Sequence, residues 1–202
     1  STDYVFDGSG SRPWVETDAP APLSVYGRTK LEGEQRIQAA CKQHLILRTS
    51  WVYAARGGNF AKTMIRLAQE RDRLTVIDDQ VGAPTGAELI ADVTAHALRQ
   101  LMQRPSDAGL YHLAAQGETS WCSYANYVLA SVSSMLTGNK SIASKPLVLK
   151  THTATPIPTS DYPTPAQRPL NSRLDTARLE ATFGLSLPPW QQGVARMLAE
   201  TL

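Results

Sequence analysis

The stretch HLILRTSWVYA, residues 44–54, decides the fold class, because residues 45–47 form a short continuous apolar run. Such a run is typical of a strand in a parallel sheet that is covered on both faces. A helix is expected before it, over roughly residues 24–43 with Ser24 as its N-cap. Another helix is expected after it, from about residue 59. The strand therefore lies between two helices in the chain.

The same alternation continues along the sequence. Strands are expected at LTVIDD (residues 74–79) and LYHLAA (110–115), and helices at AELIADVTAHALRQLMQR (87–104) and from about residue 120. Residues 5–6 are expected to end a further buried strand. Repeated β-α-β order predicts an α/β fold with a doubly wound parallel sheet.

Composition narrows the classes of function. The 202 residues are 42% hydrophobic with a formal charge of +2, and the basic residues are scattered, which argues against a nucleic-acid partner. Two cysteines, Cys41 and Cys122, are too few for a disulfide scaffold and lack metal-site spacing. No apolar run approaches the length of a membrane span, and no signal peptide is present. We therefore expect a cytoplasmic protein with no membrane partner.

The stretch PLSVYGRTKLEGEQRI, residues 22–37, places Tyr26 and Lys30 one helical turn apart, on one face of a helix. An ammonium next to a phenol favours the phenolate, and a proton donor works best when its pKa approaches the working pH. The Thr2 hydroxyl would add a hydrogen bond to the oxygen that gains charge. This set predicts reduction of a carbonyl by an external hydride, whereas the pair alone also fits an ordinary exposed helix face.

Several candidate ligand contacts follow expected strands. A doubly wound sheet binds its ligand at the carboxyl ends of the strands. Thr2 and Asp3 lie near one such end, and Trp51 lies near another. We expect Thr2, Tyr26 and Lys30 to converge on one ligand. The alternative for Thr2 is to cap a turn, and the alternative for Trp51 is a packing role.

With Thr2 upstream, the Tyr-x-x-x-Lys spacing of YGRTK resembles the Thr/Ser–Tyr–Lys triad of the short-chain dehydrogenase/reductase superfamily. Longer stretches narrow the resemblance and run in order over nearly the whole chain; they are STDYVFDG, PLSVYGRTKLEGE, LILRTSWVYA, NFAKTMIRLA, DQVGAPTGAELIAD, GLYHLA and RPLNSRLDT. Together they resemble the dTDP-4-dehydrorhamnose reductase family. The resemblance implies an incomplete Rossmann-like doubly wound parallel sheet with a smaller C-terminal substrate lobe.

The resemblance also implies a reaction. That family reduces the C4 ketone of dTDP-4-dehydro-β-L-rhamnose to dTDP-L-rhamnose, a precursor of cell-surface polysaccharides such as lipopolysaccharide, with NADPH or alternatively NADH. Tyr26 would donate the proton to the C4 alkoxide, and Lys30 would hold the nicotinamide ribose and promote ionisation of the phenol. Thr2 and Asp3 would contact the sugar.

Further residues are assigned to the substrate by the same resemblance. Trp51 would pack against the sugar, and Tyr4 would contact the substrate. Arg168 would pair with the diphosphate, while Pro84 and Thr85 would line the nucleotide pocket. Nucleotide-sugar 4,6-dehydratases carry Asp-Glu after the threonine, as acid and base for water loss, whereas this chain carries Asp-Tyr.

The sequence departs from the superfamily at the nucleotide end. The superfamily's nicotinamide domain opens with a glycine-rich strand–turn–helix that seats the pyrophosphate, and the glycines near the start of this chain lack that spacing. We therefore expect residues 1–202 to be an N-terminally truncated fragment of a two-lobed subunit, inactive by itself and weak in NADPH binding. Residues 1–81 and 87–135 would be mainly Rossmann-like, and residues 136–202 mainly the nucleotide-sugar lobe.

Glu88, in GAELIAD, resembles a glutamate through which some family members bind magnesium at a dimer interface, so Mg²⁺ and a homodimer are further expectations. A carboxylate near a helix start is also explained by the helix dipole, and the four histidines show no metal spacing. Two other functions stay open: a non-catalytic binding subunit of the same fold, such as the β subunit of methionine adenosyltransferase, and a related nucleotide-sugar epimerase or dehydratase.

Overall fold

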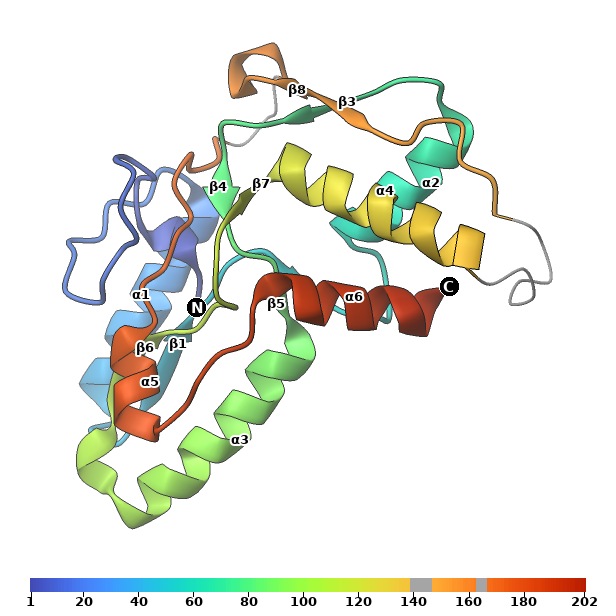
Figure 1. Ribbon diagram of the computed structural model, residues 1–202. Coiled ribbons are helices and arrows are strands. Elements are labelled where there is room, and N and C mark those ends of the chain that lie inside the picture. Colours follow the sequence, from blue (N-terminus) through green and yellow to red (C-terminus); the bar gives the residue numbers. More distant parts are fainter. Residues whose placement is uncertain (139–146, 163–166) are drawn as a thin grey trace.

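The computed structural model describes residues 1–138, 147–162 and 167–202 (Figure 1). Its helices are α1 (Val25–Ala40), α2 (Phe60–Glu70), α3 (Ala87–Gln103), α4 (Trp121–Gly138), α5 (Ala177–Phe183) and α6 (Trp190–Thr201). Its strands are β1 (Leu45–Arg48), β2 (Val52–Tyr53), β3 (Leu74–Ile77), β4 (Val81–Gly82), β5 (Thr85–Gly86), β6 (Gly109–His112), β7 (Thr119–Ser120) and β8 (Ala154–Ile157). Three short 3₁₀ turns are η1 (Asp3–Val5), η2 (Pro105–Asp107) and η3 (Thr159–Asp161).

Strand pairing is mostly parallel. Within the described residues β1 pairs with β6, β2 with β5 and β3 with β8 in parallel, whereas β4 pairs with β7 antiparallel. The expected α/β fold with parallel strands is therefore confirmed. The division into lobes stays a prediction, because β3 and β8 pair across its proposed boundary and residues 139–146 and 163–166 lie outside the described residues.

The starts of α1 and α2 follow the caps in the sequence. Ser24 Oγ accepts a hydrogen bond from the Gly27 amide at 3.1 Å, and Asn59 Oδ1 accepts one from the Lys62 amide at 2.9 Å. Each cap satisfies a backbone donor that has no partner within its helix. The expected helix starts are thus confirmed.

The prediction that a buried strand ends at residues 5–6 is wrong, because residues 3–5 form the 3₁₀ turn η1. Thr2 forms a single parallel bridge with Thr49, just beyond β1, and the chain then turns into η1. The turn forms because Thr2 Oγ1 accepts a hydrogen bond from the Tyr4 amide at 3.2 Å. Residues 5–6 are nevertheless buried, which is why they resemble the end of a strand.

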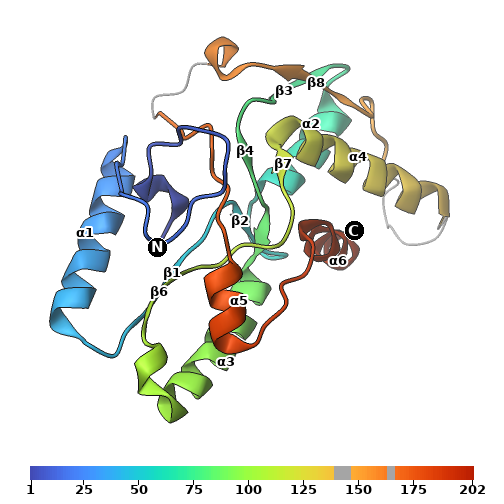
Figure 2. The ribbon, with the colours of Figure 1, turned by 60° about the vertical axis from the view of Figure 1, so that its left-hand side comes forward.

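Among the described residues, the buried apolar side chains form two clusters. The larger cluster packs α2, α4 and α6 around β3 and contains Tyr124, Leu129 and Val194. The smaller cluster packs α3 and α5 onto β6 and contains Leu113 and Phe183. Figure 2 shows α1 beside β1, on the side away from α3 and α5. Every helix in the described ranges is too short or too polar to span a bilayer.

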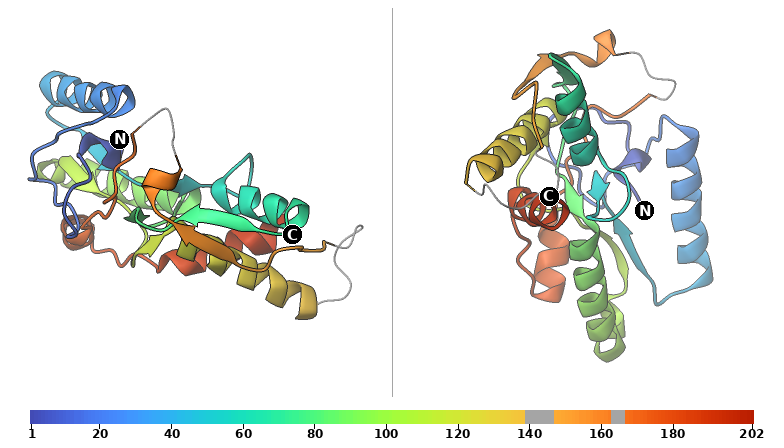
Figure 3. Two further views of the ribbon diagram at one scale, coloured as in Figure 1. Left: turned by 90° about the horizontal axis from the view of Figure 1, so that it is seen from above. Right: turned by 90° about the vertical axis from the view of Figure 1, so that its right-hand side faces the viewer.

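Helix α1 lies at the edge of the molecule, next to the turn η1 (Figure 3). It buries only Gly27 and Glu34. The Glu34 carboxylate accepts hydrogen bonds from Arg48 Nε at 2.9 Å and from Arg48 Nη2 at 2.6 Å. The two side chains are only 2% and 4% exposed, so this bidentate pair ties the middle of α1 to the end of β1.

Candidate active site

Tyr26 and Lys30 lie together on the first two turns of α1. Lys30 Nζ is 5.5 Å from the centroid of the Tyr26 ring, within the range of a cation–π contact. Tyr26 is 52% exposed, and Lys30 is also exposed. The structure therefore brings the phenol and the ammonium together at the surface, where both are open to a ligand.

Tyr26 borders an open cavity of ≈ 720 Å³. The cavity is lined by Tyr4, Leu23, Ser24, Val25, Tyr26, Arg28, Gln167 and Arg168. The rings of Tyr4 and Tyr26 meet edge to face, with centroids 5.6 Å apart and planes at 85°. Three predicted site residues, Tyr4, Tyr26 and Arg168, thus share one cavity, together with Arg28, which the sequence did not single out.

A glycine allows η1 to approach α1 closely. A Cβ atom placed on Gly27 would lie 2.1 Å from the Tyr4 carbonyl oxygen and 2.9 Å from Pro22 Cβ. Atoms cannot approach so closely, so any side chain at this position would push the turn away from the helix. The only signal in the sequence was a glycine within a helix, directly after the candidate tyrosine.

Replacing Gly27 with alanine is expected to separate Tyr4 from Tyr26 and reduce activity at least tenfold, since small misplacements at a reacting centre have effects of about this size or larger. Gly33→Ala is the matched control, because a Cβ on Gly33 meets nothing within 4 Å and alanine favours the helix. Activity and melting temperature of both variants are the measurements. Equal activity of the two variants would contradict the steric argument.

Thr2 and Asp3 are not among the residues that line this cavity. They are 5% and 2% exposed. Thr2 Oγ1 donates a hydrogen bond to Asp3 Oδ1 at 3.0 Å. Burial raises the pKa of Asp3 to about 6, although the hydroxyls of Ser172 and Thr2 oppose the shift. The predicted contacts of Thr2 and Asp3 with the sugar stay predictions.

Trp51 is held in a stack with a second tryptophan. Its ring lies 3.7 Å from that of Trp121, at 14°, and a Cβ on Gly82 would lie 2.9 Å from Trp51 Cε2. The backbone of Trp51 is left-handed, with φ of 49°. Trp51 does not line the cavity beside Tyr26, so its predicted contact with the sugar stays a prediction.

Pro84 and Thr85 are both buried. Thr85 is fully buried, where its hydroxyl donates to the Ala83 carbonyl at 3.1 Å and accepts from the Ala115 amide at 3.3 Å. The Thr85 hydroxyl thus joins the segments that contain Ala83 and Ala115 by hydrogen bonds. Neither Pro84 nor Thr85 lines the cavity beside Tyr26.

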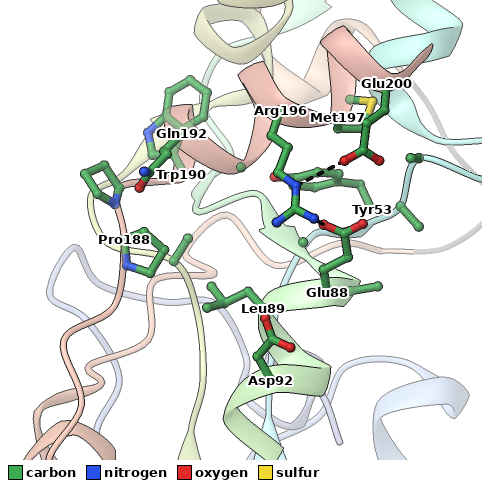
Figure 4. A pocket seen from close by; sticks show the side chains of 17 residues that line it. Tyr53, Glu88, Leu89, Asp92, Pro188, Trp190, Gln192, Arg196, Met197 and Glu200 are labelled. Carbon is green, nitrogen blue, oxygen red and sulfur yellow. Dashed lines mark hydrogen bonds and ion pairs between the residues drawn. The ribbon is translucent and has the colours of Figure 1, made fainter.

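Glu88 lies at a different cavity, of ≈ 400 Å³, between α3 and α6 (Figure 4). Arg196 Nη2 is 3.2 Å from Glu88 Oε2, and Arg196 Nε is 3.0 Å from Glu200 Oε1. The guanidinium therefore pairs with both carboxylates and offsets one of their two negative charges. No cluster of three metal-ligating side chains occurs in the described ranges, so the magnesium expectation has no support.

Parallel strand pairs, flanking helices and a tyrosine–lysine pair beside a cavity together define a Rossmann-like protein of the short-chain dehydrogenase/reductase class. The model of the family described as RmlD substrate binding domain matches residues 1–202, and the chain belongs to this family.

Named relatives agree with this assignment. The chain is 57% identical over 200 residues to a dTDP-4-dehydrorhamnose reductase of Escherichia coli (strain K12), covering 99% of this chain and 64% of the relative. It is 46% identical to the dTDP-4-dehydrorhamnose reductase of Sinorhizobium fredii, covering 98% of this chain and 64% of the relative. The chain thus spans slightly less than two thirds of the length of these curated relatives.

Solved structures show the same fold. The structure of dTDP-4-dehydrorhamnose reductase from Bacillus anthracis in complex with NADP matches with a TM-score of 0.81 at 32% identity, covering 100% of this chain and 64% of that one. The Bordetella bronchiseptica enzyme WbmG, in complex with NAD, matches with a TM-score of 0.73 at 16% identity, covering 98% and 56%. The second likeness concerns the fold alone.

Proposed function

We propose that the protein is a dTDP-4-dehydrorhamnose reductase, which reduces the C4 ketone of dTDP-4-dehydro-β-L-rhamnose to dTDP-L-rhamnose with NADPH. The observation that carries this proposal is the position of Lys30 Nζ, 5.5 Å from the ring of Tyr26 at an open cavity. The identities to relatives of that name support it.

Tyr26 acts as the proton donor in this proposal. NADPH supplies the hydride that adds to C4, and the phenol of Tyr26 gives its proton to the oxygen that becomes an alkoxide. Solvent then returns a proton to the phenolate, because half of the side chain is exposed. Proton transfer by a positioned side chain contributes typically about 10²- to 10⁴-fold to a rate.

Lys30 would hold the ribose of the cofactor. It is exposed and lies beside Tyr26, and within the described ranges no carboxylate forms an ion pair with it, so its three donors suit a ribose. The NADP in the B. anthracis relative supports NADPH as the cofactor.

The arginines of the cavity would bind the diphosphate. Arg168 and Arg28 both line it, and among the described residues no carboxylate does. Guanidinium groups match phosphate oxygens in charge and geometry. Tyr4 would contact the sugar from the same side as Tyr26, because the two rings are in contact.

The product would serve a cell-surface polysaccharide. A Bacillus subtilis relative, 40% identical over 129 residues, is named spore coat polysaccharide biosynthesis protein SpsK. Dehydration is disfavoured for this chain, because Tyr4 stands where the dehydratases carry glutamate.

The test is oxidation of NADPH by the natural full-length protein, followed by absorbance. Oxidation is expected with dTDP-4-dehydro-β-L-rhamnose and not with dTDP-glucose, which has no ketone at C4. Product analysis should show dTDP-L-rhamnose. No oxidation above the sugar-free rate would refute the proposal.

A further inference from the structure

The hydroxyl of Thr2 is already engaged by two partners. Thr2 Oγ1 lies 3.0 Å from Asp3 Oδ1, and the Tyr4 amide donates to the same Oγ1 at 3.2 Å. A threonine hydroxyl has one proton and two lone pairs, whereas an ionised carboxylate only accepts. With Asp3 ionised, the Thr2 proton therefore points to Asp3, and one lone pair is used by the amide. A single lone pair remains, so Thr2 can only accept a hydrogen bond from a ligand.

We propose that Asp3 is a positioning residue, which sets whether Thr2 donates or accepts a hydrogen bond at the C4 oxygen of the sugar; this inference rests on the proposed function. A protonated Asp3 donates its own proton to the remaining lone pair of Thr2. The Thr2 proton is then free to be donated to a ligand. Protonation of Asp3 thus reverses the hydrogen-bonding role of Thr2.

The two roles suit the two sides of the reaction. A ketone oxygen can only accept hydrogen bonds, so it is stabilised when Thr2 donates. The hydroxyl of the product can also donate, so it matches a Thr2 that only accepts. Protonated Asp3 therefore favours the keto sugar, and ionised Asp3 favours the alcohol.

The surroundings of Asp3 allow both protonation states. Its side chain is 2% exposed, and within the described ranges Oδ2 has no hydrogen-bond partner. Desolvation is the largest influence and raises the pKa of Asp3 to about 6. The titratable or charged groups on the neighbouring segments are the Ser1 amino group, the side chains of Tyr4, Arg48, Arg168 and Arg173 and, along α1, those of Tyr26, Arg28, Lys30, Glu32, Glu34 and Arg36. None of them forms an ion pair with Asp3 in the described part of the chain.

The experiment compares pH profiles of the natural full-length protein and its Asp3→Asn variant, with NADPH and the keto sugar, between about pH 5 and about pH 8. The wild-type kcat/KM for reduction, divided by that of the variant, is expected to rise about three- to tenfold as the pH falls through the pKa of Asp3. A factor of this size corresponds to one hydrogen bond. For oxidation of dTDP-L-rhamnose the same ratio should change by the same factor, because both directions pass through one transition state. The affinity for dTDP-L-rhamnose, measured as a product-inhibition constant, should instead fall as Asp3 becomes protonated.

Substitutions at Thr2 separate this role from a merely structural one. Thr2→Ser keeps a hydroxyl and is expected to keep the pH step, whereas Thr2→Val is expected to lose it although Asp3 still titrates. These variants also provide the test if Asp3→Asn fails to fold. The Asp3→Asn variant is expected to fold at about pH 8. A carboxyl group whose pKa is raised in the folded protein destabilises the fold once the pH exceeds that pKa, and the asparagine amide carries no charge to bury.

Three results would overturn the inference. An active protein with a flat ratio, or with a step that persists in Thr2→Val, contradicts the role of Asp3 alone. A wild-type protein that never reduces the keto sugar contradicts the proposed function, and the role of Asp3 with it.

Discussion

Replacing Tyr26 with phenylalanine is expected to lower kcat for reduction of the keto sugar by roughly 10²- to 10⁴-fold. The substitution removes only the hydroxyl that donates the proton, whereas the ring and its edge-to-face contact with Tyr4 remain. Since the side chain is 52% exposed, the free energy of unfolding should hardly change. Steady-state kinetics of the natural full-length protein, with KM determined separately, is the measurement.

A second tyrosine supplies the control for that experiment. Tyr162 is 55% exposed and does not line the cavity around Tyr26, so Tyr162→Phe removes an equally accessible hydroxyl elsewhere. It should leave kcat and KM within about twofold of the wild type. If Tyr26→Phe retained a similar turnover, the phenol would not be the proton donor.

Replacing Arg48 with methionine is expected to reduce the free energy of unfolding by about 3–5 kcal/mol, the range for a buried ion pair that loses one partner. Methionine retains most of the length of the side chain but leaves the Glu34 carboxylate, 2% exposed, without its partner. The attachment of α1 to β1 would weaken, so Tyr26 and Lys30 should become less well ordered. Urea denaturation provides the measurement.

Two further variants test the origin of this loss. Arg36→Met removes an exposed arginine of the same helix, whose partner is Glu32, and is expected to change stability by at most about 1 kcal/mol. The double variant Glu34→Leu/Arg48→Met removes both buried charges and should recover most of the loss. A loss for Arg48→Met no greater than that for Arg36→Met would show that the buried pair does not hold α1.

Local sequence signals determined much of the fold. Apolar runs such as residues 45–47 identified parallel strands, because a strand covered on both faces needs continuous apolar residues. Ser24 identified the start of α1, because its side chain can satisfy a free backbone amide. The prediction for residues 5–6 was wrong, because their burial resembled that of a strand. The turn that Thr2 caps there had been only the alternative interpretation.

The site was harder to predict wherever a residue depends on distant parts of the chain. The pairing of Tyr26 with Lys30 follows from helical spacing alone. In contrast, the pairing of Glu88 with Arg196 joins α3 to α6, and no local pattern specifies it. The same holds for Gly27, whose importance lies in a carbonyl oxygen from a different segment.

The left-handed backbone at Trp51 places two demands on one position. Glycine or asparagine would relieve the torsion, but neither can replace the indole that stacks on Trp121. Neither residue carries an aromatic ring, so a library that randomises this codon should divide into variants with a relaxed main chain and variants that keep an aromatic ring stacked on Trp121. The natural residue, tryptophan, belongs to the second group, so at this position stacking on Trp121 outweighs the strain of the left-handed backbone.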